Sequence, residues 1–288
     1  MSKRSSITVS YDNFDSSKLV LADEPYALEK GGKLASIRYQ ECGKLFDILR
    51  IQTPELTIGN VWDNIDDKTG QLSSYTIALN LDCLHPQDME NGIEDIPEGC
   101  EDELLIRRYQ QSVFVETLES IDNVTIEKAS TRGWFKEKGK PLERTGVQAK
   151  FSNTVHWPSD AKYTLGIRVK INVKDVTFEN RKVFICDEQE RDVSYYKIDQ
   201  QTNERVYIHD ERFNTVNSDT PIFNIDSLKT RGARILRSVI ESNNAWIQNG
   251  LSCSWKLMNV QVETVEDTSY GQNAWLNSTT NSKRKRDE

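Results

Sequence analysis

The sequence has few residues that carry out chemistry near neutral pH. It contains three histidines in 288 residues, which leaves little capacity for general-base catalysis. The motifs Gly-x-x-x-x-Gly-Lys-Ser/Thr, Gly-x-Gly-x-x-Gly, Gly-x-Ser-x-Gly and His-Glu-x-x-His are all absent. His156 lies between Val155 and Trp157, where a packed or hydrogen-bonded side chain is the simpler interpretation. We therefore expect a binding protein and not an enzyme.

The cysteines and the apolar segments exclude two further classes. The five cysteines are scattered and never form a Cys-x-x-Cys pair, which favours a reduced, intracellular protein. Only His85 lies close to a cysteine, whereas a zinc site usually needs four ligands, so we expect no metal or other cofactor. No run approaches the roughly 18 apolar residues of a membrane helix, and the N-terminus lacks the apolar centre of a secretory signal.

Charge is distributed unevenly along a chain whose net charge is -8. Residues 82–103 contain nine aspartates and glutamates and no lysine or arginine, and their prolines and glycines predict a loop. Residues 131–174 contain ten lysines and arginines and three acidic residues. A segregated patch of this kind can produce a local field opposite in sign to the net charge. A polyanionic partner is therefore compatible with the acidic composition.

The segment 162–174 combines this positive charge with a strand pattern. Apolar side chains alternate with polar ones, as in "YTLGIRVKINVK", which is typical of a half-buried β-strand. The register places Arg168, Lys170 and Lys174 together on the solvent face, without an acidic residue among them. Such a row is typical of one wall of a phosphate-binding track.

Aromatic residues are interleaved with the cations that precede this strand. Basic grooves that hold phosphates, together with aromatic faces that stack bases, are the usual means of binding single-stranded nucleic acid. We expect a flexible flap that carries cations, and rings that stack on bases, although tryptophans in loops often fill a core instead. The cations expected on the flap are Lys136, Lys138, Lys140 and Arg144. Lys150 is expected to contact a further phosphate. The residues expected to stack on bases are Trp134, Phe135 and Trp157.

Hydrophobic periodicity predicts a mainly β chain with one packed α-helix. We expect an N-terminal extension at 1–30, a single domain at 31–263 and a disordered polar tail at 264–288. The helix is expected at 102–122, with a further turn to about 129, and an irregular stretch at 130–161. Strands are expected at 6–11, 33–40, 44–58, 75–82, 162–174, 233–241, 245–248 and 252–263, with a hairpin formed by 182–187 and 193–199.

Two blocks of sequence resemble a known family. "LRIQTPELTIGNV" followed by "YTIALNLD", and later "SLKTRGARILRSVIESNNAWIQNGLSCSWKLMNVQVE", are similar to the single-stranded DNA-binding proteins of nucleocytoplasmic large DNA viruses, which are related to phage replication single-stranded DNA-binding proteins. The resemblance implies an OB-fold-like five-stranded barrel with extensions. It also implies a non-enzymatic role in viral DNA replication, recombination or repair. The positions that match the family are Gln52, Thr53, Pro54, Trp246, Gly250, Trp255 and Lys256. The resemblance adds Lys256 to the expected DNA contacts. It also implies that Pro54, Gly250 and Trp255 determine the fold.

The sequence departs from this family at its end, where an acidic tail is usual. Here the tail carries Lys283, Arg284, Lys285 and Arg286, which suits a nuclear localisation signal, a phosphate contact or an inert solubilising tail. The acidic residues 82–103 are the alternative docking element for replication proteins. We expect the protein in the host nucleus or the viral factory, with virion association left open. A structural or assembly protein of the virion is the alternative function; a homodimer and the choice between DNA and RNA also remain open.

Overall fold

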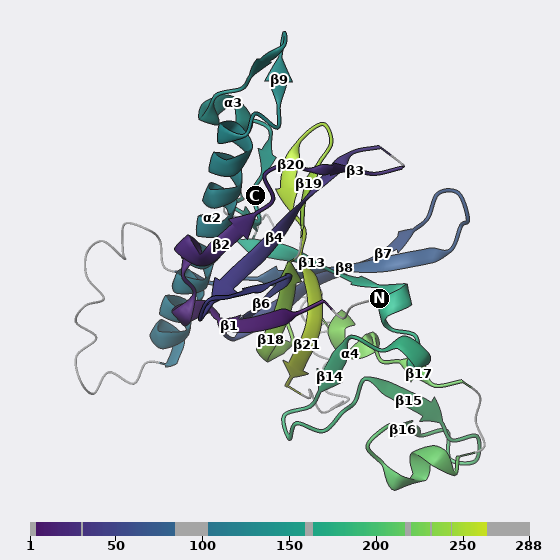
Figure 1. Cartoon of the computed structure of the whole chain (residues 1–288). Coiled ribbons are helices and arrows are strands. Elements are labelled where there is room, and N and C mark those ends of the chain that lie inside the picture. Colours follow the sequence, from purple (N-terminus) through teal and green to yellow (C-terminus); the bar gives the residue numbers. More distant parts are fainter. Residues whose placement is uncertain are drawn as a thin grey trace, which may run out of the picture.

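The computed structural model describes residues 4–29, 31–83, 103–158, 164–216, 220–230, 232–242 and 244–263. Most of the acidic segment expected at 82–103, and the whole polar tail expected at 264–288, lie outside the described residues. The described chain is mainly β with one long α-helix, as predicted (Figure 1). Among the described residues, none of the helices is long and apolar enough to cross a membrane.

Five strands close into a barrel. Neighbours around the barrel pair in the order β7, β8, β13, β21, β18 and back to β7. All of these pairs are antiparallel except β13 with β21, which is parallel. A closed five-stranded barrel in which the fourth strand along the chain pairs with the first is the Greek-key arrangement of an OB-fold, so the expected fold class is confirmed. The strands are β7 (Leu56–Ile65), β8 (Leu72–Asn80), β13 (Gly166–Asn172), β18 (Arg234–Ser242) and β21 (Lys256–Val262).

The first barrel strand is bent at Pro54. Both β6 (Ile48–Gln52) and β7 pair with β18, and the break between them falls at residues 53–55. Proline has no amide hydrogen for a β-ladder. Its neighbour Thr53 keeps the link attached, because its amide donates to the Ser238 carbonyl (2.8 Å) and its hydroxyl contacts that of Ser238 (2.8 Å). The strand expected at 44–58 is therefore divided into β5 (Lys44–Phe46), β6 and β7.

The helix α2 (Glu103–Thr131) joins β8 to β13 and lies between two cores. Phe114, Leu118 and Ile121 are buried in the barrel core, and Ile126 and Ala129 in a second core. The helix is continuous through the further turn that was expected to about 129, and its last turns pack on a second sheet. That sheet contains β2 (Leu19–Leu21), β3 (Tyr26–Ala27), β4 (Lys33–Glu41), β5, β11 (Phe151–Ser152), β19 (Asn244–Ile247) and β20 (Leu251–Cys253).

The hairpin predicted from 182–187 and 193–199 is wrong. β14 (Phe184–Cys186) pairs in parallel with β21, whereas β15 (Tyr195–Ile198) pairs with β16 (Arg205–Tyr207) and β17 (Ile222–Phe223). One bridge, Cys186 to Asp192, remains between the two segments. The Asp187 carboxylate accepts hydrogen bonds from the backbone amides of Gln189 and Arg191 in the turn between the two segments, and beyond this turn the strands join different sheets. At the other end of the barrel sheet, β1 (Ser6–Ser10) pairs in parallel with β6.

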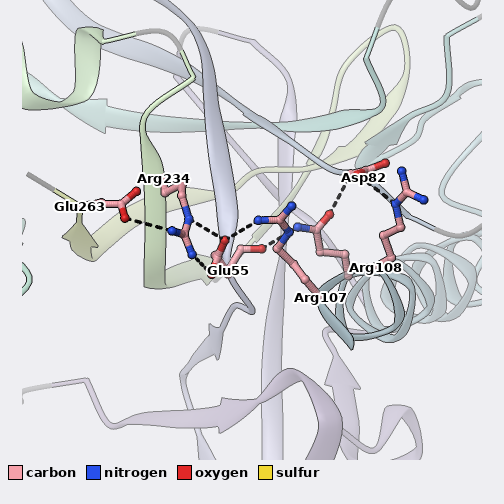
Figure 2. Close-up of polar contacts among 7 residues, drawn as sticks. Glu55, Asp82, Arg107, Arg108, Arg234 and Glu263 are labelled. Carbon is pink, nitrogen blue, oxygen red and sulfur yellow. Dashed lines mark hydrogen bonds and ion pairs between the residues drawn. The ribbon is translucent and has the colours of Figure 1, made fainter. Parts of the chain in front are cut away.

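Ion pairs join the start of α2 to the barrel (Figure 2). The Glu55 carboxylate accepts hydrogen bonds from Arg107 of α2 (2.9 Å) and from Arg234 of β18 (2.9 and 3.0 Å). Arg234 also donates to Glu263 (2.9 Å). Hydrogen bonds from Arg234, and after them from Arg107, outweigh burial and hold the pKa of Glu55 below its ordinary value. Glu55 therefore stays ionised at neutral pH and ties the helix to two strands.

We expect Glu55→Ala to lower the free energy of unfolding by about 1.5–3 kcal/mol, because it removes charged hydrogen bonds from a partly buried site. Urea unfolding at neutral pH measures this loss. Asp226→Ala is the matched control, because Asp226 also pairs with an arginine but its side chain is 49% exposed. The control should lose less than about 1 kcal/mol, and equal losses for the two variants would contradict the anchoring role of Glu55.

The buried carboxylate of Asp122 binds Thr154, in the segment that leads from α2 back to β13 of the barrel. Asp122 of α2 is 5% exposed and accepts hydrogen bonds from the amide and the hydroxyl of Thr154, both at 2.7 Å. The indole of Trp255, itself 3% exposed, donates to the Thr154 hydroxyl (3.2 Å), as suits a fold determinant. Burial raises the pKa of Asp122 from 3.8 to about 6 although the Thr154 hydrogen bonds oppose it.

This shift predicts a specific pH dependence of stability. Because the pKa is higher in the folded state, folding favours the protonated carboxyl, and this contribution declines as the pH rises from 3.8 to about 6. Asp122→Asn removes the titration. Between pH 4 and pH 7 we expect the unfolding free energy of the wild type to fall relative to that of this variant by about 2 kcal/mol. Urea unfolding across this range measures the difference, and a pH-independent difference would contradict the prediction.

Candidate nucleic-acid interface

The outer side of β7, β8 and β13 forms an open surface, called here the barrel face. It presents Trp62 from β7, Thr76 and Ala78 from β8, and Arg168 and Lys170 from β13. In β13 the alternate residues Ile167, Val169 and Ile171 are buried in the barrel, whereas Arg168 and Lys170 are exposed. The alternation predicted from the sequence is therefore present over 166–172, whereas residues 162 and 163 of the expected strand lie outside the described residues.

The register brings a ring and a cation together across the middle strand. Lys170 is paired with Thr76, which is paired with Trp62 on its other side, and Arg168 is paired with Ala78. Paired residues share a face of the sheet, and the side chains of Thr76 and Ala78 are short. Arg168 reaches over them, so that its guanidinium carbon lies 5.7 Å from the centre of the Trp62 ring, which is within the range of a cation–π contact.

Trp62 was not predicted as a site residue, because residues 59–74 have the composition of a turn. In the structure β7 runs to Ile65, and the turn is confined to 66–71, where the Asp66 carboxylate accepts hydrogen bonds from the amides of Lys68 and Thr69. The pairing of β7 with β8 shifts between Ile58 and Val61. A shift of this kind breaks period-two alternation, which hides the strand. Trp62 is 41% exposed, and this exposed ring is the signal that only the structure provides.

The two cations of the barrel face are free to bind an anion. Within the described residues, neither Arg168 nor Lys170 forms an ion pair, and the side-chain contact of Arg168 is with Trp62. An exposed cation that no carboxylate neutralises can pair with a phosphate at little cost. The described ranges contain no cluster of three or more His, Cys, Asp or Glu side chains able to hold a metal ion.

Lys174 and Lys256 have different surroundings from Arg168 and Lys170. Lys174 is exposed but lies in a 3-10 turn, Val173–Asp175, so that the strand register does not align it with Arg168. Lys256 is paired with Lys170, yet its Nζ lies 3.7 Å from the Asp175 carboxylate. Burial alone would raise the pKa of Asp175, but hydrogen bonds from Lys182 and Asn172 outweigh it and lower this pKa. Asp175 is therefore ionised and offsets part of the charge of Lys256.

The expected flap is a hairpin at the far end of α2. Lys136 is in β9 (Lys136–Glu137), Lys140 is in β10 (Lys140–Pro141), and Lys138 is in the turn between them, with φ +49. All three side chains are exposed. Arg144, in α3 (Arg144–Gln148), is tied to α2 by an ion pair with Glu127 (3.2 Å). Figure 1 shows β9 well away from β8 and β13, so the structure does not bring the flap together with the barrel face, and closure of the flap over a strand stays a prediction.

The aromatic candidates are of two kinds. Trp134 and Phe135 are half-buried and pack on the second core, and the Trp134 indole donates to the Asp23 carbonyl (3.1 Å). Their packing agrees with the alternative interpretation, a structural role at the edge of this core, and base stacking by their rings stays a prediction. Trp157 is 44% exposed, and its indole donates to Glu119 (2.9 Å). It follows β12 (Val155–His156), which pairs with the start of β13, so it remains a candidate beside the barrel face.

Lys150 has an exposed side chain that precedes β11. Its carbonyl accepts a hydrogen bond from the Leu251 amide (2.9 Å). A Cβ at Gly250 would lie 2.8 Å from this same carbonyl oxygen, so glycine is needed there for the two backbones to approach. Gly250 is thus a fold determinant, as expected, and Lys150 lies beside the β19–β20 hairpin.

Comparisons with known proteins give a limited result. No family model matches the chain, and no curated protein matches it. Among solved structures, the chain is similar to a single-stranded DNA-binding protein from bacteriophage Enc34 in complex with single-stranded DNA, with 11% identity, a TM-score of 0.30 and coverage of 87% of this chain and 97% of that one. A C-terminal truncation of the same phage protein gives 11% identity, a TM-score of 0.30 and coverage of 88% and 98%. The phage protein alone gives 11% identity, a TM-score of 0.28 and coverage of 87% of this chain and 94% of that one. These neighbours are single-stranded DNA-binding proteins, but such low TM-scores assign no ligand to this chain, whose barrel is established by its own strand pairings.

Proposed function

We propose that this protein is a non-enzymatic single-stranded DNA-binding protein that holds its ligand across the barrel face. The observation that carries the proposal is the arrangement of Arg168 and Lys170, which form no ion pair among the described residues, beside the exposed ring of Trp62. Cations in a row bind successive phosphates, and an exposed ring stacks a base of any identity. The strands equivalent to β8 and β13 are also where OB-folds generally bind oligonucleotides.

In this mechanism the bound DNA breaks the cation–π contact between Arg168 and Trp62. An exposed cation–π contact contributes about 0.5–1 kcal/mol, whereas a stacked base contributes about 1–3 kcal/mol. A base therefore displaces the guanidinium from the ring, and Arg168 turns to the neighbouring phosphate. Because neither contact reads the edge of a base, binding has little dependence on sequence.

We further propose that the protein acts in viral DNA replication, recombination or repair, in the host nucleus or the viral factory. The support for this setting is the resemblance of residues 49–61, 75–82 and 227–263 to the proteins of large DNA viruses. The acidic residues 82–103 are proposed to dock replication proteins. These assignments are separate from the barrel face, and their failure would leave DNA binding intact.

Titration with fluorescently labelled oligothymidylate tests the proposed function. We expect tight binding at low salt that weakens steeply as salt increases, together with much weaker binding of duplex DNA of the same length. A parallel titration with single-stranded RNA determines which sugar is preferred. Absence of binding to every nucleic acid at low salt would overturn the proposal and favour the alternative role in virion assembly.

A further inference from the structure

A second exposed aromatic surface lies outside the barrel, on the sheet built around β4. β4 pairs with β3 on one side and with β19 on the other, and the register aligns Tyr26 with Leu34 and Leu34 with Trp246. Residues aligned across neighbouring strands share a face, so the two rings flank Leu34 on the same side of the sheet. Tyr26 and Trp246 are 48% and 37% exposed.

Positive charge adjoins the ring of Tyr26. A pocket of about 270 Å³ is lined by Arg4, Tyr26, Ser36, Arg38, Asp47 and Asn244. Within the described residues, neither Arg4 nor Arg38 forms an ion pair. The lining carboxylate, Asp47, accepts hydrogen bonds from the amide and the hydroxyl of Ser5 (3.2 and 3.3 Å). The pocket therefore combines two guanidinium groups that form no ion pair among the described residues with one carboxylate and the exposed ring of Tyr26, a net positive site suitable for an anion attached to an aromatic group.

The ring of Trp246 packs closely against the backbone of Gly32. A Cβ at Gly32, which has φ +81, would lie 3.2 Å from Cζ2 of this ring. Glycine thus leaves room for the indole to lie against the backbone, while the residue keeps 37% of its surface exposed. A ring held in this way loses little further freedom when a base stacks on it, which favours binding.

The second surface is connected to the barrel face through the β19–β20 hairpin. This hairpin lies between β18 and β21 in the chain and rejoins the barrel at Trp255, whose carbonyl accepts a hydrogen bond from the Lys170 amide (3.0 Å). Figure 1 shows β3, β19 and β20 together on the sheet that rises from the barrel near β13. A strand that leaves the barrel face at Lys170 therefore has this sheet as its neighbouring surface.

We propose that Tyr26, Trp246, Arg4 and Arg38 form a second contact site for single-stranded nucleic acid, which a strand enters after it leaves the barrel face. This site rests on the proposed function of the barrel face. The rings stack bases and the arginines bind the phosphates between them, as on the barrel face. A short oligonucleotide fills the barrel face alone, whereas a longer one reaches both surfaces.

The test compares two lengths of oligothymidylate with the Tyr26→Ala/Trp246→Ala variant. OB-folds cover about 4–16 nucleotides each, so lengths of about 8 and about 24 nucleotides separate one surface from two. We expect the short oligonucleotide to bind the variant within about twofold of the wild type, and the long one to bind about fivefold or more weakly. The number of nucleotides of polythymidylate that each protein molecule covers should also fall.

Charge variants provide an independent readout that does not depend on the rings. Arg4→Gln/Arg38→Gln removes two phosphate contacts, so the slope of log affinity against log salt should become shallower by about 1.4 on the long oligonucleotide and stay unchanged on the short one. Arg4 is exposed and Arg38 is half-buried, and glutamine retains a polar side chain of similar length at both positions, so this variant decides the question even where the alanine variant folds poorly. Tyr26→Phe/Trp246→Phe keeps both rings and should retain binding to the long oligonucleotide.

The outcomes separate the second site from the barrel face. An unchanged affinity and footprint on the long oligonucleotide, or equal losses at both lengths, would overturn the second site while leaving the proposed function standing. If the wild-type protein binds neither length, the proposed function itself fails. A loss confined to the long oligonucleotide, in both the ring and the arginine variants, supports two surfaces on one strand.

Discussion

Replacement of Arg168 and Lys170 together by alanine is expected to weaken binding to all single-stranded DNA sequences by about tenfold or more at physiological salt. Each cation neutralises one phosphate, and on single strands each phosphate contributes about -0.7 to the slope of log affinity against log salt. The double variant should therefore reduce the magnitude of this slope by about 1.4. Fluorescence anisotropy of a labelled oligothymidylate, measured from about 50 to 300 mM salt, provides both values.

The matched control is Lys44→Ala/Lys197→Ala, which removes the same charge from outside the barrel face. Lys44 and Lys197 lie in β5 and β15, and each Nζ contacts a phenylalanine ring, that of Phe46 and Phe213 respectively. The control should change affinity by less than about twofold, because it alters only the long-range field, which salt screens. If the two double variants behave alike, binding depends on net charge and the barrel face has no special role.

Trp62→Ala is expected to weaken binding to single-stranded DNA about 5- to 150-fold, which corresponds to about 1–3 kcal/mol for one stacked base. The salt slope should stay near that of the wild type, because no phosphate contact is removed. Trp62→Phe keeps a ring and should recover most of the affinity. Because Trp62 is 41% exposed, the free energy of unfolding should change by less than about 1 kcal/mol.

Trp157→Ala distinguishes the contribution of Trp62 from that of any exposed tryptophan. Trp157 is 44% exposed and is hydrogen-bonded to Glu119 on α2. A loss smaller than that of Trp62→Ala places the main stacking contact on β7. Full affinity in Trp62→Ala combined with a large loss in Trp157→Ala would move the contact to the junction of β12 and α2, and would contradict the assignment of the base to the barrel face.

Local patterns predicted the elements whose residues alternate without interruption. β13 repeats with period two and α2 has an apolar stripe, so their positions were correct within a few residues. β18 and β19 were also placed within a few residues, although β18 contains register shifts, whereas the strand expected at 252–263 is divided into β20 and β21. Arg168 and Lys170 followed directly from that alternation. The exposed basic surface of an acidic protein was thus predictable, because strand register is a local property.

Features that depend on tertiary neighbours were not predictable. The bulge near Gly59 hid β7 and with it Trp62, and nothing in the sequence around Lys256 indicates that Asp175 lies 3.7 Å from its Nζ. Trp134 and Phe135 lie among cations in the sequence, but the second core against which they pack is built from segments far apart in the chain. Sequence composition cannot distinguish an aromatic side chain that packs on a core from one that is exposed and able to stack on a base.

Photocrosslinking identifies the surface that touches DNA most directly. An oligothymidylate carrying 5-iodouracil is bound at low salt and irradiated, and the crosslinked peptides are identified by mass spectrometry. If a strand lies across β7, β8 and β13, Trp62 is a principal site of crosslinking, and Arg168→Ala/Lys170→Ala reduces its yield. Crosslinks at the β9–β10 hairpin or elsewhere, with none at Trp62, would contradict the barrel face as the binding surface.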